Sequence, residues 1–468
     1  MLLLKQREIT DHLSQASDSL SWKCCRAFDS CTVVGIRRVP MDVLAEIFLF
    51  YLASEPSCSP WTLTAVSRTF RVTAFSTPRL WGHIKITTKK YFRRWIDGSE
   101  QCNTLRRLQR ALARAAAAPL DIIVNLRTEP AMHYKQQKRA TKLLRTLFRT
   151  SSRWASLIID DLSMHDFDFR WIEGNYGSLE SLVMASTTPQ KLIQAIGRSH
   201  PNLTTLRAEG FQIENFISCW SRLTTLFYEA HSRDDNAADR IRILDNITQC
   251  TLLRQLRLSM GTLRFTTDEV RLYNSRSLPN LRKLYFANVN CAMLFECPNL
   301  THLSYKTNYR MPPCLTTIVM QDTNEFRLEH LVYCEVRSPF IEQYLVPLVA
   351  PNLQDLHIAA VSTYGRTSLG VDVLKSTLKK MEALRILEMS CVEIAKTAFE
   401  TFVIEPKDRK RSILCPKLVR LNVEVPIPKD GDLKPILKEV AESRRIAGIP
   451  LKSLRYRSLG ETVDLCQN

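Results

Sequence analysis

A short phrase of leucines recurs through most of the chain, and it limits the possible folds more than any other feature. The phrase is L-x-x-L-x-L with conservative substitutions, repeated at intervals of mostly about 20 to 34 residues. The tripeptide Pro-Asn-Leu opens several copies, and its proline favours an extended approach to a strand. The copies begin at Leu179, Leu203, Leu223, Leu253, Leu281, Leu300, Leu315, Leu328, Leu353, Leu384, Leu418 and Leu451.

Helical patterns separate these strand-like phrases. The predicted helices span residues 104–118, 132–149, 191–198, 238–250, 340–349, 371–381 and 433–446, and two earlier strands are predicted at 120–124 and 157–159. A strand and a helix cannot bury their apolar faces alone, so we expect the units to stack around one continuous core. The sequence therefore predicts an α/β chain. A doubly wound sheet is the less favoured alternative, because leucine recurs at a fixed phase.

The pattern resembles a leucine-rich-repeat solenoid with a curved parallel sheet. It departs from that family's consensus because Val289 and Val392 occupy positions where the family has asparagine. The resemblance therefore implies stacked repeats of irregular shape.

The stretch from Val39 to Ile86 has a different character and predicts three short helices. Ser59 and Pro60 are typical of an N-cap followed by the first turn of a helix, and that second helix would carry Leu63, Val66 and Phe70. Three short helices bury little surface between themselves, so we expect part of their apolar surface to dock on a partner or on the next domain. The stripe of the first helix consists of Leu44, Ile47, Phe48, Tyr51 and Leu52.

This stretch resembles an F-box of the variant abundant in mushroom-forming fungi. That motif reads L-P-x-E-I-L-x-x-I-F, then V-C-R-x-W, then S-T-P-x-L-W. The departures are Val39 for Leu, Asp42 for Glu, and Ser67 with Phe70 for Cys and Trp. The matching residues are Pro40, Leu44, Ile47, Phe48, Leu52, Val66, Arg68, Ala74, Ser76, Thr77, Pro78, Leu80 and Trp81.

The resemblance implies docking on the Skp-type adaptor of an SCF ubiquitin ligase, and through it on a cullin scaffold. The alternative is a three-helix cap that seals the end of the repeat array. The residues expected to bind the adaptor are Pro40, Leu44, Ile47, Phe48, Leu52, Leu63, Val66 and Phe70.

The chain is therefore expected to contain an N-terminal helix and connector (1–38), an F-box (39–86), linker helices with the first repeats (87–150) and a solenoid (151–468). The opening Met1–Leu4 is interrupted at once by Lys5, and no apolar run is long enough to cross a bilayer. We expect an intracellular protein, cytoplasmic or nuclear, that makes no membrane contact. The run Lys407–Arg411 is consistent with either a nuclear-import signal or an exposed loop.

The third and fifth residues of each phrase should point away from the core, toward the concave side of the solenoid. The middle of that row is basic and aromatic. We expect Arg207, Arg257, Lys283 and Tyr285, with Phe227 among them, to bind an acidic or phosphorylated segment of a substrate protein. The alternative is ordinary polar residues on a parallel sheet. The row contains Thr205, Arg207, Thr225, Phe227, Gln255, Arg257, Lys283, Tyr285, His302, Ser304, His330, Asp355, His357 and Glu388.

No catalytic pattern emerges from the sequence. It contains no G-x-S-x-G, no H-E-x-x-H and no glycine-rich phosphate loop, and its 14 cysteines lack C-x-x-C spacing. His302, His330 and His357 share a similar phase, but their strands are too far apart for one metal ion. We therefore expect no enzyme activity, no metal and no cofactor.

Two functions fit these expectations. The first is a non-catalytic substrate receptor of an SCF-type ubiquitin ligase. The second is a basic repeat scaffold that binds nucleic acid or an acidic protein without any ligase, which the net charge of +18 allows. The basic and aromatic run Lys89–Trp95 could contact nucleic acid, although packing of its aromatic residues on a helix is the favoured interpretation.

Overall fold

The chain folds into two compact units. Of the residues described, 39–85 and 99–122 form the first unit, and 86–87 and 123–466 belong to the second. The computed structural model describes residues 39–54, 59–87, 99–126, 134–162, 174–199, 201–210, 213–230, 237–260, 276–287, 295–306, 326–338, 341–345, 348–360, 368–390, 393–394, 396–404, 413–425, 432–458 and 461–466. Outside these residues lie the predicted N-terminal helix (1–38), the run Lys89–Trp95, the phrase at Leu315, Val289, Val392 and the run Lys407–Arg411.

The first unit is helical. Its elements are α2 (Met41–Ser54), α3 (Pro60–Val66), α4 (Arg68–Ser76), the 3-10 helix η2 (Pro78–Trp81) and α5 (Ser99–Ala115). Ser59 caps α3 and Pro60 begins it, as predicted. However, the Ser67 side chain accepts a hydrogen bond from the Phe70 amide at 3.1 Å and begins a new helix, so the predicted second helix is in fact two.

Aromatic contacts close the core of this unit. Phe48 of α2 packs on Phe70 of α4, with 4.8 Å between ring centroids. The buried Trp81 indole donates a hydrogen bond to the Ala74 carbonyl at 2.7 Å. Helix α5 was predicted to be a linker helix, but it belongs to this unit. Its Arg114 guanidinium lies over three aromatic rings. Its distances to the ring centroids of Trp61, Phe75 and Trp81 are 4.4, 4.1 and 4.5 Å.

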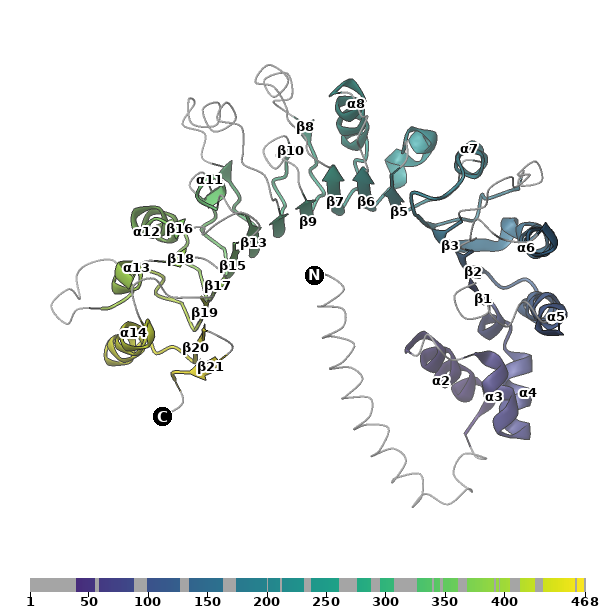
Figure 1. Ribbon diagram of the computed structural model, residues 1–468, viewed down its shortest axis with the longest axis horizontal. Coiled ribbons are helices and arrows are strands. Elements are labelled where there is room, and N and C mark those ends of the chain that lie inside the picture. The colour runs from purple at the N-terminus through teal and green to yellow at the C-terminus, as the bar shows by residue number, and fades with distance from the viewer. Residues whose placement is uncertain are drawn as a thin grey trace. The chain divides into compact units, whose positions relative to one another are not determined.

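The second unit is built on a long, open, curved and mostly parallel sheet, with helices along its outer side (Figure 1). Strands β1 (His83–Thr87) and β2 (Leu120–Asn125) each run from the first unit into the second. The sheet then follows the order β3 (Trp154–Asp161), β4 (Ser181–Met184), β5 (Thr205–Glu209), β6 (Thr225–Ala230), β7 (Gln255–Met260), β9 (Lys283–Ala287), β11 (His302–Lys306), β13 (Tyr333–Arg337), β15 (Asp355–Ala359), β17 (Ile386–Ser390), β19 (Arg420–Glu424), β20 (Ser453–Ser458) and β21 (Glu461–Asp464). The last strand alone among these runs antiparallel to its neighbour.

The connections between these strands return along the helical side. They contain α6 (Tyr134–Phe148), η4 (Ser151–Arg153), α7 (Gln190–Arg198), η6 (Ile213–Arg222), α8 (Ala237–Thr248), α11 (Glu342–Leu345), α12 (Val371–Lys379), α13 (Lys396–Glu400) and α14 (Lys434–Ile446). They also contain three short parallel pairs, β8 (Arg276–Ser277) with β10 (Phe295–Glu296), β12 (Phe326–Arg327) with β14 (Leu348–Val349), and β16 (Ser368–Leu369) with β18 (Glu393–Ile394). The predicted α/β chain with a long, curved parallel sheet is confirmed at this level.

The leucine phrases set the register of the sheet. Their fourth residues pair across neighbouring strands, so that buried side chains form one continuous row. Burial alternates along each strand, because the sixth residue also faces the helices and the third and fifth face the opposite side. The row of fourth residues includes Leu182, Leu206, Leu226, Leu256, Leu284 and Leu303.

The structure corrects two predictions in this unit. The helix expected over 340–349 is only the four residues of α11, followed by the short strand β14. The phrase assigned to Leu328 begins at Leu331 instead, because Cys334 and Val336 of β13 are the buried partners of Leu356 and Ile358. His330 therefore lies in an exposed turn, and Tyr333 and Glu335 take the outward positions.

Asparagines connect successive repeats. Each of these asparagines directly precedes the first leucine of its phrase. Its side-chain amide donates a hydrogen bond to a backbone carbonyl of the preceding repeat, and that carbonyl belongs to the residue two positions before that repeat's first leucine. The four bonds run from Asn202 to Gly177 (2.8 Å), Asn280 to Thr251 (2.8 Å), Asn299 to Pro279 (2.8 Å) and Asn352 to Glu329 (2.7 Å). The asparagine of the Pro-Asn-Leu tripeptide thus makes repeat-to-repeat hydrogen bonds along the array.

Candidate functional site

One side of α2 exposes a group of apolar side chains, called here the α2 surface. Phe50 is 75% exposed and Ile47 is 51% exposed, although both are large and apolar. Leu44 and Phe48 of the same helix are buried, so α2 fills the core with one side and presents the other. Contiguous exposed apolar groups of this kind are typical of protein-binding surfaces. The α2 surface consists of Val43, Ile47, Phe50 and Tyr51.

The structure divides the predicted adaptor-binding residues into three groups. Leu44, Phe48 and Leu63 are buried and hold the helical unit together. Pro40, Ile47 and Val66 are exposed, and Leu52 and Phe70 are partly buried. Helix α2 carries apolar residues around most of its circumference, so its sequence does not show which of them are buried. It has more apolar residues than one face can bury, and this excess predicts a second apolar surface.

The predicted substrate-binding residues lie together on the concave face, defined as the side of the sheet opposite the helices. Arg207, Phe227, Arg257 and Tyr285 occupy one register row across β5, β6, β7 and β9. Lys283 lies two residues before Tyr285 on the same strand and therefore faces the same way.

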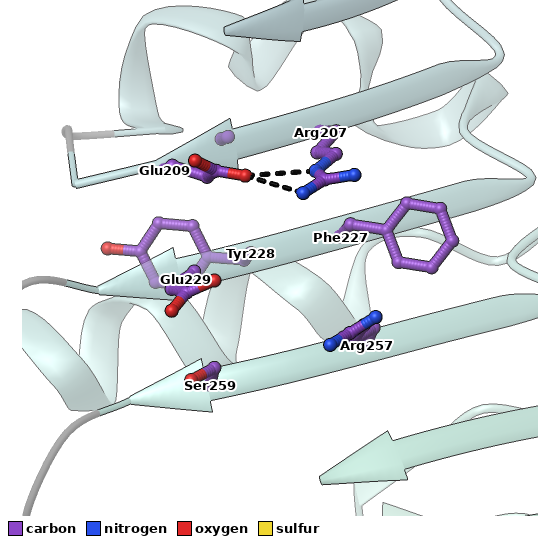
Figure 2. A pocket seen from close by; sticks show the side chains of 8 residues that line it. Arg207, Glu209, Phe227, Tyr228, Glu229, Arg257 and Ser259 are labelled. Carbon is purple, nitrogen blue, oxygen red and sulfur yellow. Dashed lines mark hydrogen bonds and ion pairs between the residues drawn. The ribbon is translucent and has the colours of Figure 1, made fainter. Parts of the chain in front are cut away.

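A hollow of about 60 Å³ opens beside this row (Figure 2). The Arg207 guanidinium donates from Nε and Nη2 to Glu209 Oε1, at 3.0 and 2.7 Å, so its charge is already compensated. Glu229 also lines the hollow. Both carboxylates are the seventh residue of a leucine phrase, whereas the predicted row contains only third and fifth residues. The seventh residue faces the same side, since side chains alternate along a strand.

Of the three predicted cations, Arg257 and Lys283 are the two whose side chains form no ion pair or hydrogen bond within the described residues. Tyr285 lies beside them. Burial raises the pKa of the Tyr285 hydroxyl, the Glu335 carboxylate raises it further, and the Arg257 guanidinium opposes the shift. The phenol therefore stays protonated at neutral pH and can donate a hydrogen bond. Together these three side chains suit an anionic group.

The next strands of the sheet, β11 to β17, carry aromatic and histidine rings and carboxylates on the concave face. The His302 ring stacks on Tyr333 with 5.8 Å between centroids, and Tyr333 contacts His357 at 5.1 Å. His357 Nδ1 lies 2.7 Å from Glu388 Oε2. Burial and Lys283 lower the pKa of His302, and Asp355 opposes them. Among the residues described, no three His, Cys, Asp or Glu side chains gather in a way that could hold a metal ion.

No family model matches the chain, and a search of curated proteins finds no match. None of the described helices combines the length and the apolar character that crossing a bilayer requires.

Proposed function

We propose that this chain is the substrate-recognition subunit of an SCF-type ubiquitin ligase. The helical unit docks on the Skp-type adaptor, and through it on a cullin scaffold, while the concave face binds a target protein. The observation that carries the proposal is the exposed α2 surface, and the resemblance of the stretch Val39–Ile86 to the F-box motif supports it. The chain itself performs no chemistry in this scheme.

The exposure of α2 favours docking over a simple cap. A cap that sealed the repeat array would bury its apolar side chains within the chain, whereas Phe50 is 75% exposed. Covering a side chain of this size is worth about 1.5–3 kcal/mol. The four residues of the α2 surface therefore suit a partner with an apolar groove and would supply much of the affinity for it.

The concave face supports a protein ligand better than nucleic acid. Arg257, Lys283 and Tyr285 can bind an acidic or phosphorylated segment, but Glu209, Glu229 and Asp355 share the same face. Fixed carboxylates repel a polyanion along its whole length, whereas a short acidic segment can avoid them. The ligase-independent scaffold is thus the second candidate, supported by the net charge of +18. Retention on DNA that falls steeply with added salt would support it.

Co-purification tests the proposal. The full chain and a Skp-type adaptor are co-expressed, and the adaptor is expected to co-elute with the chain. The double variant Ile47→Asp, Phe50→Asp should lose the adaptor, because two carboxylates would be desolvated on docking. Ile446→Asp, an equally exposed apolar position on α14, is the matched control and should retain it. Failure of the unaltered chain to bind the adaptor overturns the proposal.

A further inference from the structure

From β7 to β15, the concave-face charges that have no ion pair within the described residues separate by sign. Arg257 and Lys283 provide positive charge on β7 and β9. Asp355 provides negative charge on β15, and its carboxylate has no ion pair or hydrogen bond within the described part of the chain.

The strands between these positions carry three other charges on the same face. Lys306 at the end of β11 is exposed and has no ion pair or hydrogen bond within the described residues, so it adds to the positive charge. Glu335 on β13 is paired with Arg337 and also accepts a hydrogen bond from the Ser304 hydroxyl at 2.8 Å. This pair leaves little net charge on β13.

Glu388 on β17 provides a second carboxylate on the concave face. Its carboxylate accepts a hydrogen bond from Asn422 Nδ2 at 2.8 Å and lies against His357 Nδ1 at 2.7 Å. These contacts hold the Glu388 carboxylate in place. We call Asp355 and Glu388 the negative end of the concave face, and Arg257 and Lys283 its positive end.

A ring surface lies between the two ends. His302, Tyr333 and His357 contact one another across β11, β13 and β15. Lys283, His302, Tyr333 and Asp355 occupy one register row, so the rings lie directly between a cation and a carboxylate. Flat, half-buried rings suit the apolar parts of an extended peptide.

The spacing of the strands sets the length of such a peptide. Lys283 and Asp355 are three strand steps apart, which is about 14 Å at about 4.8 Å per step. An extended chain advances about 3.3 Å per residue, so roughly four residues span that distance.

We propose that the concave face binds an extended dipolar peptide segment. An anionic side chain, carboxylate or phosphate, binds Arg257, Lys283 and Tyr285. A lysine or arginine roughly four residues away binds Asp355 and Glu388. This inference rests on the proposed function, because it specifies the substrate that the receptor would hold.

Fluorescent peptides test the proposal by anisotropy with the full chain. One series carries two glutamates at one end and two lysines at the other, joined by a glycine-serine spacer of about two, four or eight residues, in both chain directions. A second series replaces glutamate by phosphoserine, which distinguishes carboxylate from phosphate. A third carries glutamates at both ends. The dipolar peptide with the middle spacer should bind roughly tenfold more tightly than the third series.

Charge-reversal variants assign each end. Arg257→Glu, Lys283→Glu should abolish binding of the dipolar peptide, whereas Lys375→Glu, Lys379→Glu on α12 makes the same change of net charge and should not. Asp355→Lys should shift the preference toward the doubly acidic peptide, and Asp372→Lys on α12 should not.

The outcomes separate this inference from the proposed function. Equal or tighter binding of the doubly acidic peptide to the unaltered chain overturns the dipolar inference and leaves an acidic substrate in place. The inference is also overturned if no peptide binds, or if the α12 variants act like the concave-face variants. Adaptor co-purification is measured separately and does not depend on any of these results.

Discussion

Asn352 donates its side-chain amide to the Glu329 carbonyl of the preceding repeat, at 2.7 Å. Three other asparagines make the equivalent bond, so side chains reinforce the stacking that the leucine rows begin. The bond also identifies the phase of the repeat that contains Glu329, because its acceptor lies two residues before Leu331 rather than before Leu328.

Removing one of these amides should weaken the array. Asn352→Ala leaves the Glu329 carbonyl without its side-chain donor, and a hydrogen bond of this kind contributes about 1 kcal/mol. We expect a loss of about that size in the free energy of unfolding, measured by urea denaturation. Gln249→Ala, an exposed amide with no side-chain hydrogen bond in the described part of the chain, should change stability by less than about 0.5 kcal/mol. Equal losses in both variants would contradict this role.

Phe48 and Phe50 should behave oppositely, although both belong to α2. Phe48 is buried against Phe70, and truncating a buried phenylalanine typically costs about 3–5 kcal/mol. Phe48→Ala should therefore unfold or loosen the first unit, detected by hydrogen exchange of the α2 and α4 amides. Phe50→Ala should leave that exchange unchanged, because its side chain is exposed. Similar exchange in the two variants would show that the core assignment is wrong.

Arg114 should stabilise the first unit through the rings of Trp61, Phe75 and Trp81. A partly desolvated cation over an aromatic face is worth about 1–2 kcal/mol, so Arg114→Ala should destabilise the unit by at least that much. Arg114→Lys should recover only part of the loss, because an ammonium group cannot lie flat on the rings. Hydrogen exchange of α3 and α4 measures the effect. Arg110→Ala is the control, since Arg110 is exposed and only repels Arg114. If Arg114→Ala leaves the hydrogen exchange of α3 and α4 unchanged, Arg114 does not stabilise the unit in this way.

Stability should fall as the pH rises above about 9. Burial raises the pKa of the Cys297, Cys334 and Cys415 thiols to about 12, and it raises the pKa of the Tyr176 and Tyr333 hydroxyls above the ordinary value of 10.0. The folded chain keeps these protons, and the unfolded chain loses them as the pH passes the ordinary thiol value of 9.0. Their contribution is thus complete below pH 9 and is lost between about pH 9 and 12.

Urea denaturation at pH 8.0, below the window of about 9 to 12, and at about pH 10.5, inside it, measures this loss. Cys334→Ala should reduce the slope of stability against pH by up to about 1.4 kcal/mol per pH unit, because one titrating group is gone. The slopes of stability against pH are compared because the substitution also lowers stability at every pH, and that constant loss does not change the slope. A slope of zero in the unaltered chain would contradict the expectation.

The leucine phrases predicted the sheet because they fix both the spacing and the buried side of each strand. They misplaced one repeat, because Leu328 and Leu331 are three residues apart and either can begin a phrase. Cys334 and Val336 decide between them, but neither is a leucine. Periodicity identifies the buried side only when every buried residue is recognised as apolar.

The candidate sites were less predictable than the fold. Alternation along strands placed Arg207, Arg257 and Tyr285 on one face, which required no knowledge of distant contacts. The pairing of Arg207 with Glu209 depends on side-chain geometry that alternation does not give. Which side of α2 is exposed depends on the packing of α4, so an apolar pattern around most of the helix could not settle it.

Calorimetric titration of the Skp-type adaptor into the full chain tests the central claim most directly. We predict one adaptor per chain, with affinity lowered roughly tenfold or more by Phe50→Ala and by Ile47→Ala, and unchanged by Arg257→Glu on the concave face. Both α2 variants should melt at the temperature of the unaltered chain, because their side chains are exposed. Absence of binding by the unaltered chain, or full affinity in the α2 variants, would contradict the account.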